Sequence, residues 1–342
     1  MTDVKQPIQS YVYGALSVHL YSFIVEMTKN LAYYVNKFAN LRVSRSSGVA
    51  RNKPILLLSI IEMISQGQVR RNQIPLSAEL IATFLKLWSH LEPLRKPDIG
   101  LPFYHLTSDG FWHFQMKLGF ESLIAAKVKI RTPSTIRETV EYAYLDGELW
   151  TLLQNQSDRT VLSHTLINSW FNERTHDIES LLQVNTFAEL QNQLQRTGGK
   201  VYQPEELEDE QAVIVRDSAF RKIVVSTYNH TCAFCGLQIL DSLGQNIVDG
   251  SHIKPFSQFY DDRINNGLSV CKNHHWAFDR FWFTIDDDYT IIVADNLRED
   301  SPNAKPMREF RGDRINLPAQ EQYYPRLDSL QWHREEFSRR AA

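Results

Sequence analysis

The stretch CAFCGLQILDSLGQNIVDGSHIKPFSQFYDDRINNGLSVCKNHHWAFD, residues 232–279, decides the fold of the C-terminal part of this chain. It holds all three cysteines of the 342 residues, in a C-x2-C pair and in a later C-x2-H pair. The four side chains are those of Cys232, Cys235, Cys271 and His274. Four such ligands are the number that a closed tetrahedral zinc site needs, so the pattern predicts structural Zn²⁺ rather than a disulfide framework.

A second set of polar residues lies between and after these pairs. Histidine titrates near neutral pH and can activate a water, and His252 stands at the end of an expected strand. Asn266 can hold that imidazole through its amide, or pin the loop between strand and helix. His275 and Asp279 share one face of an expected helix, so they can bind one cation, to which Asp249 can add an oxygen. This arrangement predicts hydrolysis of a phosphodiester with Mg²⁺ or Mn²⁺.

The composition limits the number of domains and the class of protein, but it does not identify the binding partner. Its length and 43% hydrophobic content allow two domains with real cores. Residues 1–200 carry 21 Lys and Arg against 17 Asp and Glu, whereas the remainder carries 16 against 23. A nucleic-acid footprint must therefore be a local patch. The apolar runs are too short for a membrane span and the first residues lack a signal-peptide pattern, so a cytoplasmic protein is expected.

Apolar periodicity predicts an α+β chain of two domains. Helices are expected over residues 11–40, from Pro54 onward, over 78–88, over 134–195, before the first cysteine and near residue 335, with short strands over 93–120. The glycine-containing, acidic segment 196–210 is the expected linker. It separates a mostly helical N-terminal recognition domain, residues 1–195 with a small β element, from a C-terminal domain, residues 211–342.

The C-terminal motifs resemble the HNH endonuclease family, whose ββα-metal fold is a β-hairpin and a helix around a metal ion. The resemblance rests on CAFCG, VDGSHIKPF and NNGLSVCKNHHWAFD and covers about residues 211–296. It implies that His252 is the general base, that Asn266 is the family's asparagine, and that His275 is its final metal-binding histidine.

The acidic residues of the site follow one branch of that family. Asp249 and Asp279 stand where this branch has acidic residues at the metal. Ser251, directly before the base, stands where many members have an aspartate ligand, so Asp249 is taken as the first ligand.

The N-terminal half resembles the sulfur-binding domain that is attached to HNH modules in phosphorothioate-dependent, type IV-like restriction endonucleases. The motifs are RNKPILLL (51–58), PFYHL (102–106) and DGFW (109–112), within a core of about residues 45–170. The resemblance implies that Arg51 and Lys53 contact phosphates. It also implies that Pro102 walls an apolar cup for a backbone sulfur, with Tyr104 and His105 beside it.

These features predict a modification-dependent restriction enzyme that cuts phosphorothioated double-stranded DNA and so defends a bacterial cell. One alternative is an HNH endonuclease that recognises another mark, such as a methylated base, or a sequence. A further alternative is a non-catalytic, zinc-containing DNA-binding protein. Arg216 and Arg221, on the helix before the first cysteine, can follow the DNA backbone or form the outer face of a packing helix. Cutting two strands with a single-site module favours a homodimer.

Overall fold

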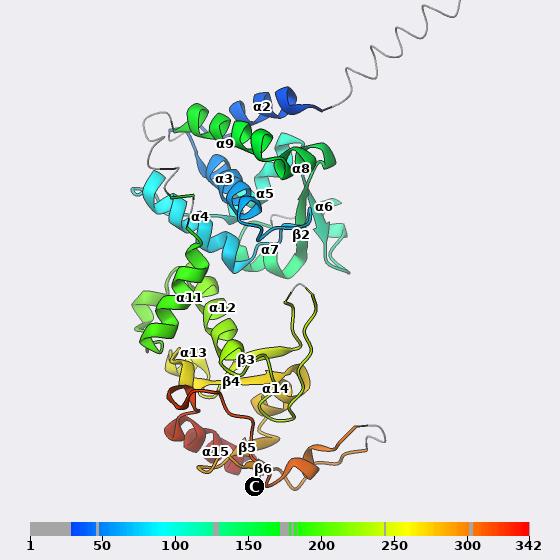
Figure 1. Cartoon of the computed structure of the whole chain (residues 1–342), viewed down its shortest axis with the longest axis vertical. Helices are drawn as coiled ribbons and strands as arrows, with labels where there is room; N and C mark the ends of the chain where they lie inside the picture. The colour runs from blue at the N-terminus through cyan, green and yellow to red at the C-terminus, as the bar shows by residue number, and fades with distance from the viewer. Residues whose placement is uncertain are drawn as a thin grey trace, which may run out of the picture. The chain divides into compact units, whose positions relative to one another are not determined.

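The computed structural model describes residues 29–45, 48–125, 130–171, 178, 181–182, 184–242, 244–300 and 304–341. The chain divides into two compact units, the first of residues 1–76 and 87–183 and the second of residues 77–86 and 184–342 (Figure 1). Both combine helices with short antiparallel hairpins, which confirms the α+β class. Of the helix predicted over residues 11–40, the part up to residue 28 lies outside the described residues. No helix in the described ranges is long and apolar enough to cross a membrane.

The first unit is built around one buried helix. Its helices are α2 (Leu31–Ala39), α3 (Asn52–Ser65), α5 (Gly100–His105), α6 (Ser122–Ala125), α7 (Pro133–Thr139), α8 (Gly147–Gln154) and α9 (Gln156–Trp170); the strands are β1 (Trp112–Met116) and β2 (Val140–Leu145). Helix α3 is apolar on nearly every side, and it packs against α5, α8 and α9. A helix without a polar face is stable only in the interior, so α3 forms the core of this unit.

The segment 93–120 differs from its prediction. Only β1 is a strand there, and it pairs with the distant β2 in antiparallel register, Trp112 opposite Leu145. Residues 102–105 of PFYHL belong to helix α5 instead, and Leu106 begins the 3-10 helix that follows. Phe103 and Leu106 are three residues apart along these turns and both are fully buried. The Trp112 indole nitrogen donates to the Phe103 carbonyl at 2.9 Å and joins the two elements.

The second unit contains the cysteine-rich stretch. Its helices are the first part of α4 (Ala78–Leu91), α11 (Thr186–Thr197), α12 (Glu210–Thr227), α13 (Phe256–Phe259), α14 (Lys272–Asp279) and α15 (Leu327–Ala341); its strands are β3 (Val248–His252), β4 (Gly267–Cys271), β5 (Phe283–Ile285) and β6 (Ile291–Val293).

A β-hairpin followed by a helix positions the predicted site. Strands β3 and β4 are antiparallel, with His252 opposite Gly267, and α14 begins directly after β4. Helix α12 packs across both strands. A Cβ at Gly250 would lie only 2.7 Å from the Arg221 carbonyl oxygen, so α12 can approach β3 this closely only at a glycine. The predicted ββα unit is therefore present, backed by α12.

The segment predicted as a linker is packed within the second unit. Backbone hydrogen bonds join Ile264 to Gly198, Asp262 to Lys200 and Tyr202 to Tyr260, at 2.9, 2.9 and 2.8 Å. Gly199 has φ +82°, and a Cβ there would meet the Asp262 carbonyl oxygen at 2.1 Å. The division between the units falls after residue 183 rather than after residue 195. We call residues 198–202 the glycine strap.

Candidate active site

Three thiols and one imidazole converge at the start of the hairpin. The ligand atoms of Cys232, Cys235, Cys271 and His274 all lie within 4.8 Å of one another, and among the described residues no other such group of three or more is found. Cys232 and Cys271 are buried. Three sulfur donors and one nitrogen donor at this separation suit a tetrahedral Zn²⁺ ion. The sequence prediction of which residues come together here agrees with the structure.

The cluster is joined directly to the strand that precedes α14. The Ala233 amide donates to the Ser269 carbonyl of β4 at 2.7 Å. Although burial opposes it, hydrogen bonds with the thiols of Cys235 and Cys271 raise the pKa of His274 to about 9. Hydrogen bonds from Cys232 and Cys235 hold the pKa of the Cys271 thiol well below its usual range. Hydrogen bonds with Cys235 and Cys271, together with burial, raise the pKa of the Cys232 thiol, so the pocket stabilises the thiolate, the form of cysteine that binds metal, at Cys271.

The side chain of His252, the proposed general base, is held in place by ring stacking and by a hydrogen bond at one of its two nitrogens. The His252 ring stacks on Phe220, with centroids 3.9 Å apart and planes 6° apart. Its Nε2 lies 2.8 Å from an oxygen of Asp262, while Nδ1 has no hydrogen-bond partner among the described residues. A proton on Nε2 satisfies the carboxylate and leaves the Nδ1 lone pair to accept a proton from water.

Asp262 is the residue that sequence reasoning missed. Its side chain is fully buried, and it also accepts from Arg216 on α12. The one sequence signal was the acidic pair of residues 261–262 in the loop before NNGL. Arg216 is only 7% exposed and stacks on Phe256 at 3.6 Å. The expectation that Arg216 contacts DNA is thereby corrected, because its charge is used inside the unit.

Asn266 pins a loop and does not touch the imidazole. Its amide nitrogen donates to the carbonyls of Lys254 and Asp261, at 3.2 and 3.0 Å, and its amide oxygen accepts from the Lys254 backbone at 3.0 Å. The side chain is completely buried. Of the two roles open from sequence, the structure supports the second, and the loop so fixed carries Asp262.

Asp249 and Asp279, the two predicted acids of the metal site, lie at opposite nitrogens of the His275 imidazole. Its Nδ1 lies 3.7 Å from Asp249 on β3, and its Nε2 lies 3.7 Å from Asp279, one turn along α14. Hydrogen bonds from His275 and from Lys272 lower the pKa of Asp249 to about 2, so this carboxylate is ionised at neutral pH. The two acids thus face opposite nitrogens, whereas the sequence suggested that both would bind one ion together with His275.

One cleft contains both the predicted general base and one of the predicted metal ligands. A cavity of about 360 Å³ is lined by His252 and Asp279, with walls from the loop after β3 and from α15. Asp249 lines a different hollow, together with Arg221 and Lys222 of α12. Since a base and a cation must reach the same phosphorus, the pair within one cleft is His252 and Asp279.

In the first unit, a hollow lies at the N-terminal end of α3. It has a volume of about 370 Å³, and Pro102 and His105 line it as predicted. Leu101 and Val43 add apolar surface, and the exposed Arg42 adds a cation. Sequence reasoning missed Leu101 and Arg42 as lining residues, although Arg42 opens the basic stretch before α3.

Two of the predicted phosphate contacts in this unit are engaged elsewhere. The Lys53 ammonium uses its three donors on the Asp109 carboxylate, the Arg42 carbonyl and the Ser108 hydroxyl, at 2.6, 2.7 and 3.1 Å. It is 5% exposed, so the expected phosphate contact is corrected to a buried ion pair beneath the cup. Arg51 remains half-exposed but pairs with Glu92 at 2.9 Å.

The two other residues predicted to bind DNA are Tyr104 and Arg221. Tyr104 packs on Phe114 and His105 and does not line the hollow. Arg221 is half-exposed, with its guanidinium on the Gly250 carbonyl and on Asp217.

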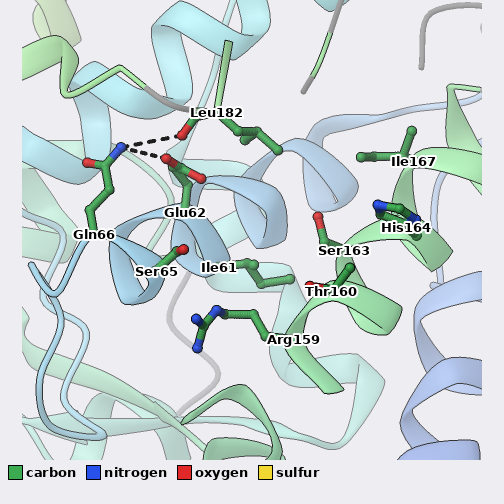
Figure 2. Close-up of a pocket in the computed structure, with 10 residues that line it drawn as sticks. All are labelled: Ile61, Glu62, Ser65, Gln66, Arg159, Thr160, Ser163, His164, Ile167 and Leu182. Carbon is green, nitrogen blue, oxygen red and sulfur yellow. Dashed lines mark hydrogen bonds between the residues drawn. The ribbon is translucent and has the colours of Figure 1, made fainter. Parts of the chain in front are cut away.

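A separate pocket of about 470 Å³ lies between α3 and α9 (Figure 2). The Gln66 amide there donates to Glu62 and to the Leu182 carbonyl. None of the predicted site residues lines this pocket.

The buried carboxylate allows a first prediction. Replacing Asp262 by asparagine keeps its volume but removes the negative charge and leaves one acceptor oxygen for two donors, Arg216 and His252. We therefore expect kcat to fall about ten- to a hundredfold, part of what a general base contributes. Affinity for DNA should stay unchanged. Single-turnover cleavage and equilibrium binding measure the two quantities. Equal losses in the D217N variant, a partly exposed acid on α12 that pairs with Arg221, would contradict the assignment.

Comparisons with known proteins match both halves of the chain. Residues 232–286 match the family model described as HNH endonuclease, and residues 32–187 match that described as ScoMcrA-like, DNA sulfur-binding domain. Among solved structures, one titled "Modification dependent TagI restriction endonuclease" is 25% identical over 36% of this chain and 38% of that chain, with a TM-score of 0.27. The match thus spans well under half of that protein. No curated protein matches the chain.

The two matched ranges coincide with the two sites described above. The HNH match includes the thiol cluster, the β3–β4 hairpin and α14, and the second match includes the hollow at the start of α3. Residues 32–187 are therefore similar to the ScoMcrA-like DNA sulfur-binding domain, and residues 232–286 are similar to an HNH endonuclease.

Proposed function

We propose that this protein is a restriction endonuclease that recognises phosphorothioated double-stranded DNA and hydrolyses its phosphodiester bonds. The observation that carries the proposal is the single cleft that His252 and Asp279 both line. A base and a cation-binding acid in one cleft can act on opposite sides of one phosphorus.

The chemistry assigns a proton to a defined atom. A water lying against Nδ1 of His252 gives up its proton to that nitrogen while its oxygen forms a bond to phosphorus. The P–O bond to the leaving oxygen breaks, and this oxygen takes a proton from solvent. Asp262, through Nε2, keeps the ring oriented and stabilises the imidazolium that forms.

Two kinds of metal ion fit the donor sets. His275 and Asp279 would hold a divalent ion, Mg²⁺ or Mn²⁺, and Asp249 would orient the ring from its other nitrogen. Such an ion supplies charge neutralisation at the phosphate. The thiol cluster with His274 would hold Zn²⁺ in a structural role.

Recognition of the mark follows from the hollow at α3. A phosphorothioate sulfur is larger and less strongly hydrated than a phosphate oxygen, so its transfer to an apolar wall costs less. Leu101, Pro102 and Val43 offer that wall, and Arg42 supplies charge for the anionic backbone. We also expect two copies on one site, because each copy has one nuclease centre for two strands.

A plasmid assay tests the proposal. Matched plasmids that are unmodified, methylated or phosphorothioated are incubated with the protein in Mg²⁺ and in Mn²⁺, and the products are separated on a gel. We expect linearisation of the phosphorothioated plasmid alone. Equal cutting of all three would overturn recognition of a mark, selective cutting of the methylated plasmid would replace the mark, and binding without cutting would overturn catalysis.

The apolar wall of the hollow at α3 leads to a separate prediction. Leu101, 37% exposed on the wall of the hollow, should be needed for the preference for sulfur. In the Leu101→Ser variant we expect the ratio of affinities for phosphorothioated and plain duplexes to fall about three- to tenfold, since apolar contact area is lost. Fluorescence anisotropy at fixed salt measures both affinities. Leu118, 94% exposed outside the hollow, gives the control variant Leu118→Ser, whose ratio should stay at the wild-type value.

A further inference from the structure

The cleft that contains His252 and Asp279 has a wall from the C-terminal helix. Residues Trp332, Glu336 and Arg340 of α15 line it, more than fifty residues after the last HNH motif. The matched HNH range ends at residue 286, so this wall lies outside it.

Helix α15 is fixed to the helix that carries the metal-site residues. The His333 ring stacks on Phe278 of α14, with centroids 3.8 Å apart and planes 2° apart. Its Nε2 donates to the Phe278 carbonyl at 3.2 Å, and Nδ1 accepts from the Thr284 hydroxyl at 2.8 Å. Burial lowers the pKa of His333 to about 3, so the ring is neutral and this hydrogen-bond pattern persists at neutral pH. The wall is therefore held in a set position relative to α14.

Arg340 brings to this cleft a charge that is not neutralised by a carboxylate. Among the described residues no acidic group lies within ion-pair distance of its guanidinium, which instead sits 4.3 Å from the centroid of the Phe281 ring. By contrast, its neighbour Arg339 pairs with Glu336. A guanidinium on an aromatic face keeps its N–H edges available for an oxyanion. Of the residues that line the cleft, Arg340 is the one with a permanent positive charge.

We propose that Arg340 binds a non-bridging oxygen of the DNA phosphate that enters the cleft beside His252. The inference rests on the proposed nuclease function and adds to it a substrate contact from α15. A planar guanidinium can donate two parallel hydrogen bonds to a phosphate. At the reacting phosphate, such donors also stabilise charge that develops in the transition state. Helix α15 would then be part of the active site rather than a cover for it.

The adjacent arginines provide a matched test. In full-length protein we expect Arg340→Ala to slow single-turnover cleavage of phosphorothioated DNA about a hundredfold, with Arg340→Lys intermediate and Arg339→Ala within about twofold of wild type. Both positions are exposed, so all three variants should unfold at the wild-type temperature. Equal rates for the R340A and R339A variants would overturn the proposal.

A binding measurement separates this inference from the function on which it rests. In EDTA, without cleavage, the slope of log affinity against log salt concentration should fall by about 0.9 in the R340A variant and stay constant in the R339A variant. If wild-type protein never cuts DNA, the nuclease proposal fails, but this slope still reports whether Arg340 contacts a phosphate. An unchanged slope together with an unchanged rate would assign Arg340 to the surface alone.

Discussion

Replacing His252 by alanine should reduce cleavage about 10²- to 10⁴-fold, the usual contribution of a general base. The imidazole stands between Phe220 and the cleft with Nε2 on Asp262, and no other histidine lines this cleft except the neutral, buried His333. The other candidate bases in the cleft are the carboxylates of Asp279 and Glu336, of which Asp279 is assigned to the metal ion and Glu336 pairs with Arg339. Single-turnover cleavage of the phosphorothioated plasmid is the measurement.

The design of this experiment distinguishes lost chemistry from lost structure. The His252→Gly variant removes the ring and leaves a space beside Phe220, so added imidazole should restore part of its activity. The control is His90→Ala, an exposed histidine of α4, which should cut at the wild-type rate. If the His252→Ala variant retains more than about a tenth of wild-type activity, the assignment of the base is wrong.

The second large effect is expected at the thiol cluster. We expect the purified protein to contain Zn²⁺, and removal of one ligand in the His274→Ala variant to release it at chelator concentrations that wild type resists. In finger peptides such ions contribute about 10–16 kcal/mol to folding at neutral pH. That value is comparable with the whole net stability of a typical domain, about 5–15 kcal/mol. The hairpin next to the cluster should therefore unfold.

Two neighbouring histidines allow a clean comparison. His274 points to the thiols, while His275 points to Asp249 and Asp279. The His275→Ala variant should keep its zinc and its thermal stability while losing cleavage, whereas the His274→Ala variant should lose all three. Zinc content by elemental analysis and unfolding by calorimetry supply the data. Zinc retained in His274→Ala at every chelator concentration would contradict the assigned ligand set.

Local patterns in the sequence predicted the parts of the site whose geometry is local. The C-x2-C and C-x2-H pairs each lie on one turn, and His275 and Asp279 lie on one helix face, so their residue types and spacing were sufficient. The β3–β4 hairpin with α14 was predicted by the resemblance of the same stretch to the HNH family. The apolar run after Pro54 likewise predicted a helix.

Contacts between distant segments were beyond such patterns. Lys53 was expected at a phosphate because of the resemblance to the sulfur-binding domain, and Arg216 was expected on the DNA backbone or on the outer face of a packing helix. Their partners Asp109 and Asp262 lie 56 and 46 residues away. Asp262 itself belongs to no motif, and Arg340 enters the cleft from the end of the chain. PFYHL formed a helix because the burial of Phe103 and Leu106 outweighed the proline and the aromatic residues that suggested a strand.

The glycine strap determines where an HNH fragment of this protein can begin. Residues 198–202 hydrogen-bond the loop that bears Asp262, and Gly199 lies against that loop too closely for any other residue. A fragment that starts at residue 211, where the motif-bearing part begins, would keep every recognisable nuclease residue and still lack the backbone that seats the carboxylate behind His252. The minimal nuclease should therefore start before residue 198, and its boundary is dictated by tertiary support and not by the extent of the motif.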